Sequence, residues 1–244
     1  MNREAVILYW RFLLSLYVLT RKPMKRNKAS KKQKVATFKL WALPASAMPI
    51  LVTFAYLFWR GVDINWAKGA AVLAITLVWA YLLGEALSKL LKIGKLSTIG
   101  YFIMLAGISV GPALVASYAA TGFWIWDILW AVAPVSLISA GILRAKNARD
   151  IQAPSRCTAF VYGIEMLLPM TAMGICSIIG ILPMHTIILF MTSPVSVALY
   201  RTMKRGVKEG PRPVVDLDTR TVNFLLTFST LAIAAFVSAR YFFV

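Results

Sequence analysis

Long apolar segments alternate with short polar connections along most of the chain. Seven of them lie at residues 40–59, 66–87, 99–120, 123–143, 159–182, 184–200 and 222–244. A helix needs roughly 20 mostly apolar residues to cross a hydrocarbon core of about 30 Å. The pattern therefore predicts an all-α fold, a polytopic membrane helix bundle with about seven transmembrane helices.

An eighth apolar segment, residues 5–20, contains Arg11 and is followed by a basic stretch. A cleavable signal peptide carries its positive charge first and ends in small residues, and this segment does neither. We expect an interfacial helix here, or an eighth span. The predicted organisation is a basic cytoplasmic N-terminal segment, residues 1–38, followed by a transmembrane domain, residues 39–244.

Lysine and arginine are concentrated in alternate connections. Residues 21–39, 89–95, 144–156 and 201–220 carry 22 of the 27 basic residues. All four connections fall on one side of a path that crosses the membrane seven times, and the loops on the other side carry only Arg60 and Lys68. Because positively charged loops stay in the cytoplasm, we expect this side to be cytoplasmic, with Val244 outside, in a plasma or inner membrane.

The composition agrees with a membrane protein, since 59% of the residues are hydrophobic and only 15% are charged. The net charge of +18 is explained by topology and by attraction to anionic lipid, so the lipid bilayer is the expected partner and nucleic acid is not. Cys157 and Cys176 match no zinc or redox spacing, and we expect both to pack as small hydrophobic residues.

Four segments of the chain carry recognisable motifs. The first begins with Pro44, Ala45, Ser46 and Pro49, within LPASAMPILV. The others are residues 99–122, the loop ILRAKNARDIQ at residues 142–152, and PVVDLDTRT at residues 213–221. In this order the four segments resemble the UbiA superfamily of intramembrane prenyltransferases, and most closely its dihydroxynaphthoate polyprenyltransferase (MenA-type) branch. The resemblance implies a UbiA-like bundle, shortened by one helical hairpin between the two motif positions.

The resemblance also implies an activity, the transfer of a polyprenyl group from its diphosphate onto an aromatic or quinone-precursor acceptor. Ionisation of an allylic diphosphate leaves negative charge on the departing group, and carboxylate-bound Mg²⁺ ions neutralise it. In the family, two Asp-rich motifs at cytoplasmic helix ends hold these ions, so Mg²⁺ is the implied cofactor.

Both motifs are altered in this chain. In the natural register Lys89 and Lys92 replace the two acids of the first motif, and lysines cannot hold Mg²⁺. The second motif keeps Asn147, Arg149 and Asp150, but Gln152 and Pro154 stand in place of its later acids. The candidate residues for binding a diphosphate are listed here together: Asn147, Arg149, Asp150, Arg156, Lys89 and Lys92, with Arg144 and Lys146 nearby.

Asp150 is the one candidate metal ligand, and the alternative is that it pairs with Arg149 or Arg156. We expect Glu165 to lie near the cytoplasmic surface in a structural role. We expect Asp216 and Asp218, which precede Thr219, to cap the last helix.

Two main functions follow from these observations. The first is a divergent prenyltransferase that acts on a polyprenyl diphosphate and an aromatic acceptor. The alternative is a non-catalytic relative that binds an isoprenoid, a quinone or a pigment, or that serves as a subunit in a membrane complex with another membrane protein. A small transporter is a third possibility, favoured only by the loss of the acids.

Overall fold

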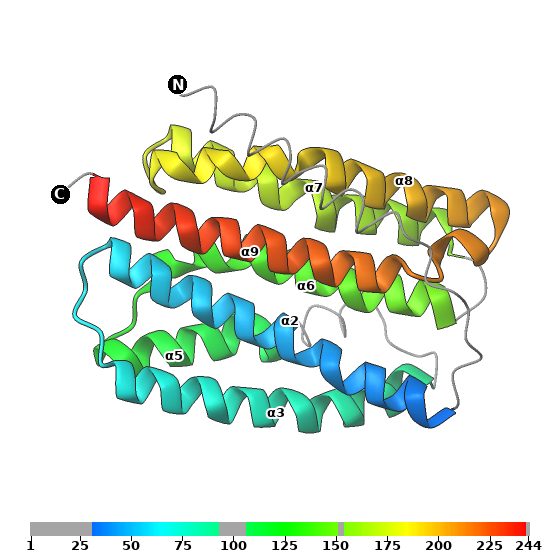
Figure 1. Ribbon diagram of the computed structural model, residues 1–244, viewed down its shortest axis with the longest axis horizontal. Coiled ribbons are helices and arrows are strands. Elements are labelled where there is room, and N and C mark those ends of the chain that lie inside the picture. The colour runs from blue at the N-terminus through cyan, green and yellow to red at the C-terminus, as the bar shows by residue number, and fades with distance from the viewer. Residues whose placement is uncertain (1–30, 93–105, 151–153, 243–244) are drawn as a thin grey trace. The chain divides into compact units, whose positions relative to one another are not determined.

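The computed structural model describes residues 31–92, 106–150 and 154–242 (Figure 1). The chain divides into two compact units, Met1–Ala36 and Thr37–Val244. The described part of the first unit is the beginning of one helix, and the helices discussed below belong to the second unit. The expected apolar segment at residues 5–20 lies outside the described residues.

Helices and turns make up the described residues, which contain no β-strand. The α-helices are α2 (Lys31–Trp59), α3 (Trp66–Lys92), α5 (Gly111–Thr121), α6 (Leu129–Asp150), α7 (Arg156–Ile178), α8 (Ser193–Glu209) and α9 (Leu217–Phe242). Shorter helical turns join them: η1 (Ala106–Val110), η2 (Trp126–Ile128), η3 (Met184–Thr192) and η4 (Arg212–Val214). The prediction of an all-α fold is confirmed for this part of the chain.

Four helical segments among the described residues are long and apolar enough to cross a membrane: Trp126–Arg149, Arg156–Ile178, Met184–Glu209 and Arg212–Phe242. Leu43–Trp59 of α2 and Trp66–Trp79 of α3 are further apolar helical stretches among the described residues. These four segments, together with the composition, indicate a helical membrane protein.

Helix α6 lies at the centre of the packing. It contacts α7 on one side and α9 on another, while α3 packs against α5 (Figure 1). The core is apolar and includes Ile138 of α6, Tyr162 and Met166 of α7, and Phe228 of α9, all fully buried. Since α6 joins several neighbours, its polar residues are well placed to hold the helices together.

Two prolines lie within α2, and one of them is compensated by α6. Pro49 has no N–H group, so it cannot donate the helical hydrogen bond to the carbonyl of Ala45. The Ser139 hydroxyl of α6 lies within hydrogen-bond distance of that carbonyl, at 3.3 Å, and of the Val135 carbonyl in its own helix, at 3.2 Å. Serine and threonine side chains on neighbouring helices commonly satisfy a carbonyl left unpaired by proline in membrane proteins. The Pro-Ala-Ser-x-x-Pro pattern thus has a structural role here.

The end of α8 differs from the prediction. The predicted span ended at Tyr200, but the helix continues to Glu209. It continues because Met203 and Gly206 remain buried, and a Cβ atom at Gly206 would meet Val214 at 2.6 Å and Pro154 at 3.2 Å. Hydropathy alone could not reveal this, because the exposed positions between these residues are charged.

The loops that were predicted to lie outside meet at one end of the helices. The Asn65 amide donates to the Ala120 carbonyl at 2.9 Å, which joins the α2–α3 connection to the end of α5. The ring of Trp124 stacks on Tyr118, with centroids 4.8 Å apart. Trp66 and Trp124 are therefore exposed near the same end of the second unit.

Candidate functional site

The last turns of α6 carry the partly retained Asp-rich motif. Asn147 and Arg149 are half-buried there, and Asp150 is the last residue of the helix. Arg149 Nη1 donates to Asp218 Oδ2 in the first turn of α9. The Asp218 side chain is 1% exposed and that of Arg149 is 33% exposed, so the ion pair has a buried carboxylate and a partly exposed guanidinium.

This pair extends the expectation for Asp218. Helix α9 begins at Leu217, so Asp218 lies within its first turn and does not precede it. Its other carboxylate oxygen accepts from the Thr219 amide at 2.9 Å, while Oδ2 faces Arg149. Asp218 therefore binds an amide in the first turn of α9, as expected of a capping acid, and it also joins α9 to α6. The sequence carried no signal for this, because the partner lies 69 residues away.

A second ion pair lies one turn further into α6. Arg144 Nε donates to both carboxylate oxygens of Glu165 at 2.9 Å, and Nη2 donates to Oε1 at 2.8 Å. Glu165 is only 4% exposed, between α6 and α7. This pairing agrees with the structural role expected for Glu165, whose side chain is buried against α6. An acid within an apolar run was the signal for a paired position, and Arg144 on the preceding helix is its partner.

A hydrogen bond between two uncharged side chains joins α7 to α9. The hydroxyls of Tyr162 on α7 and Thr221 on α9 lie 2.7 Å apart, and both residues are fully buried. Helices α6, α7 and α9 are thus joined pairwise by polar contacts. Buried polar groups that are fully paired fix the relative register of the helices that carry them.

The other predicted residues lie at helix ends, and several of their side chains are outside the described residues. Lys89 and Lys92 lie in the last turns of α3, but their side chains are outside the described residues, as are the side chain of Asp150 and all of residues 151–153. Arg156 is exposed in the first turn of α7. Cys157 beside it is also exposed, so the prediction of a packed Cys157 is wrong, whereas Cys176 is buried as expected.

The described residues do not fit the implied Mg²⁺ ions. They bring no three His, Cys, Asp or Glu residues together as a possible metal site. The two buried acids nearest the motif, Glu165 and Asp218, are each bound by an arginine. A carboxylate that already accepts charge-assisted hydrogen bonds is a poor ligand for a hard cation. The described residues therefore support no reaction step that uses Mg²⁺.

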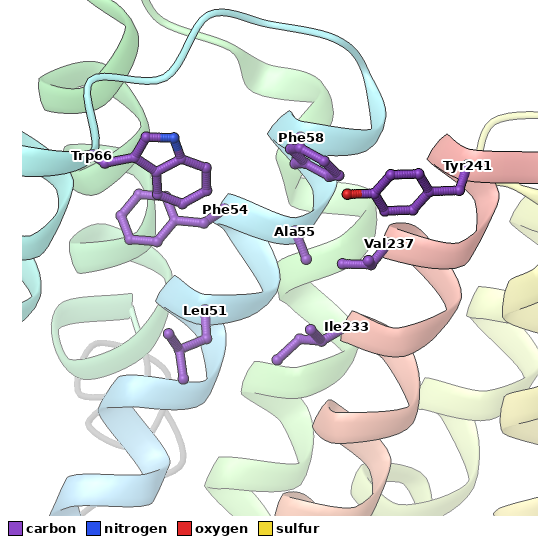
Figure 2. A pocket seen from close by; sticks show the side chains of 8 residues that line it. All are labelled: Leu51, Phe54, Ala55, Phe58, Trp66, Ile233, Val237 and Tyr241. Atoms are coloured by element: carbon purple, nitrogen blue, oxygen red, sulfur yellow. The ribbon is translucent and has the colours of Figure 1, made fainter. Parts of the chain in front are cut away.

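An apolar cavity of about 340 Å³, open to the surface, lies between α2 and α9 (Figure 2). Its lining residues are Leu51, Phe54, Ala55 and Phe58 of α2, Trp66 at the start of α3, and Ile233, Val237 and Tyr241 of α9. Figure 2 shows Ala55 and Phe58 facing Val237 and Tyr241 across the gap between the two helices. The tips of Trp66 and Tyr241 are its polar groups, so the cavity suits an apolar chain.

The cavity and the basic end of the helices are far apart. Asp218 and Ile233 are separated by 15 residues of α9, which corresponds to about 22 Å at 1.5 Å per residue. The sequence did not reveal the cavity, because its lining residues are ordinary apolar positions of two helices that are distant in the chain.

No protein-family model matches the chain, and neither a curated protein nor a solved structure is significantly similar to it. What the fold indicates is a helical membrane protein with an apolar cavity at one end and arginine–carboxylate pairs toward the other. The resemblance to the UbiA superfamily stays a prediction that rests on the four motifs.

Proposed function

We propose that this protein binds a long isoprenoid chain within the membrane, as a non-catalytic relative of the UbiA prenyltransferases. The ligand class is an isoprenoid diphosphate or a quinone-like molecule, with an apolar tail and a polar head. The observation that carries the proposal is the apolar cavity between α2 and α9. Apolar and aromatic linings with few polar groups are typical of sites for such ligands.

The distance along α9 between the cavity and the basic residues sets a minimum length for the ligand. A molecule that fills the cavity and also reaches the basic residues at the end of α6 must extend over about 22 Å. Arg156, Lys89 and Lys92 lie at helix ends on the side that the topology predicts to be basic, where they would attract an anionic head. A long apolar tail with a charged or polar head meets both requirements.

The divergent prenyltransferase is the second candidate. Its support is the position of Asn147 and Arg149, which stand in the last turns of α6, where the resemblance puts the second Asp-rich motif. The reaction needs neutralising charge on a departing diphosphate, which carboxylate-bound metal supplies in the family. Because Lys89 and Lys92 replace two of the acids, and Arg149 engages Asp218, binding without turnover is the better-supported function.

The proposed arrangement in the membrane has seven spans, of which α3 forms the second and α5 forms part of the third. The protein lies in a plasma or inner membrane in this arrangement, with its basic side toward the cytoplasm and Val244 outside. A second membrane protein that forms a complex with this one would co-purify with it and with the isoprenoid.

Binding of a labelled polyprenyl diphosphate to the purified protein tests the proposal. Val237→Trp fills the cavity, and Ala234→Trp places the same ring on an exposed position of α9. We expect Val237→Trp to weaken retention about tenfold, since overpacking an apolar site costs about 1–3 kcal/mol. Ala234→Trp should bind as the unsubstituted protein does.

The same preparation decides between the two candidates. It is incubated with Mg²⁺, the labelled diphosphate and aromatic acceptors. We expect ligand retention without a prenylated product. Product formation that Asp150→Asn abolishes would establish the prenyltransferase instead, and equal binding by the two tryptophan variants would refute the cavity as the site.

A further inference from the structure

The extended end of α8 leaves the predicted hydrocarbon layer as a basic helix. From Met184, the nine residues of η3 rise about 18 Å at 2.0 Å per residue. The first eight residues of α8, up to Tyr200, add about 12 Å. The sum equals the thickness of the hydrocarbon core, about 30 Å. With Met184 at the outer edge of the predicted span, the remaining nine residues of α8 reach the level of the lipid head groups.

This end of the helix has two distinct faces. Leu199, Met203 and Gly206 are buried and pack toward the rest of the protein. The exposed face carries four basic residues with the spacing i, i+3, i+4 and i+7: Arg201, Lys204, Arg205 and Lys208. We call these four residues the α8 basic stripe. Residues at this spacing share one face of a helix.

The stripe is not neutralised within the described part of the chain. The ion pairs there use Arg60, Arg144 and Arg149, and none involves a residue of the stripe. The four basic residues thus span about 10 Å along the helix axis, on its exposed face. Such a concentration of positive charge at the head-group level has a clear complement in lipid phosphates.

We propose that the α8 basic stripe binds the phosphates of anionic lipid head groups on the basic side of the membrane. The helix brings the cations to the depth at which these phosphates lie, and the buried face holds the helix there through Gly206, Val214 and Pro154. A soluble acidic partner would require the stripe to stand clear of the bilayer, whereas Arg201 directly follows Tyr200 at its edge. This inference goes beyond the proposed function, because it uses neither the cavity nor the end of α6.

Native mass spectrometry of the full-length protein tests the proposal. The protein is purified in neutral detergent and mixed with equal amounts of phosphatidylglycerol and phosphatidylcholine. We expect selective retention of phosphatidylglycerol. The variant Lys204→Gln/Lys208→Gln removes two charges without touching the buried face, and it should lower this selectivity at least fivefold, since one basic residue near an anionic surface contributes about 1 kcal/mol.

A matched variant, Lys25→Gln/Lys28→Gln, removes the same charge from the basic N-terminal segment. It should change the selectivity less than twofold. A competition arm adds inorganic diphosphate at the lipid concentration, and we expect the lipid to remain bound. Equal loss in both variants, or displacement of the lipid by inorganic diphosphate, would overturn the proposal, the latter by showing a site for free phosphate.

Discussion

Arg144 and Arg149 each hold a buried carboxylate on a neighbouring helix. Removing water from a charged pair is costly, and the attraction and hydrogen bonds within the pair offset this cost only when the geometry is good. Arg144 meets both oxygens of Glu165, which is the geometry that guanidinium and carboxylate favour. The pairs make the register of α6 against α7 and α9 specific.

Glu165→Gln should lower stability markedly, because the buried carboxylate that accepts the hydrogen bonds of Arg144 becomes a neutral amide. Loss of one partner from a buried pair costs about 3–5 kcal/mol. Thermal unfolding in detergent measures the effect. Asp127→Asn is the control, because the Arg60–Asp127 pair has side chains that are 48% and 60% exposed and a distance of 3.6 Å. The control should change stability by less than about 1 kcal/mol. Equal effects of the two substitutions would contradict the structural role of Glu165.

Sequence reasoning found single residues at this scale but not their partners. Glu165 was recognisable as an acid in an apolar run, and Arg149 as part of a motif. Their partners depend on how helices distant in the sequence pack, which periodicity does not encode. Asp218 shows this clearly, since its position near a helix start suggested a local cap while its carboxylate also serves a contact with α6.

At the scale of elements, each of the seven predicted spans coincides, within the described residues, with a helix or with part of one. Agreement is good because length and hydrophobicity decide where membrane helices form. The helix ends were harder to predict, as α8 shows, because tertiary contacts with Val214 and Pro154 extend it beyond the apolar segment. Residues 99–105 of the third segment lie outside the described part of the chain.

Ser139→Ala should destabilise the contact between α2 and α6. The substitution removes the hydroxyl that lies within hydrogen-bond distance of the Ala45 carbonyl, which Pro49 leaves unpaired. We expect a loss of about 1 kcal/mol in the free energy of unfolding, the usual contribution of one such hydrogen bond. Ser238→Ala is the control, because that hydroxyl bonds within its own helix. If restoring an N–H group with Pro49→Ala does not suppress the effect of Ser139→Ala, the proline explanation is wrong.

The whole molecule has two chemically different ends. The basic connections follow α3, α6 and α8, whereas exposed tryptophans and the cavity opening beside Trp66 lie near the other end. Charge asymmetry allowed the orientation to be predicted from the sequence. The cavity could not be predicted in this way, because it is the space left by the packing of α2 against α9 near Trp66.

Cys157 is a native reporter of the orientation. It is exposed at the start of α7, on the side predicted to be cytoplasmic, whereas Cys176 is buried. A membrane-impermeant maleimide should therefore leave Cys157 unlabelled in intact cells and label it after permeabilisation. Met184→Cys, at an exposed position across the predicted span, should be labelled in intact cells. The opposite pattern would reverse the predicted topology.

Photo-crosslinking maps the proposed ligand most directly. A polyprenyl diphosphate with a diazirine on its tail is activated on the purified protein, and the labelled peptides are identified. We predict labels at residues 51–58 of α2 and 233–241 of α9, and their loss in Val237→Trp but not in Ala234→Trp. Equal labelling of the exposed apolar face of α7, at Phe160, Ile164 and Leu168, would show only general contact with lipid and would contradict a specific isoprenoid site.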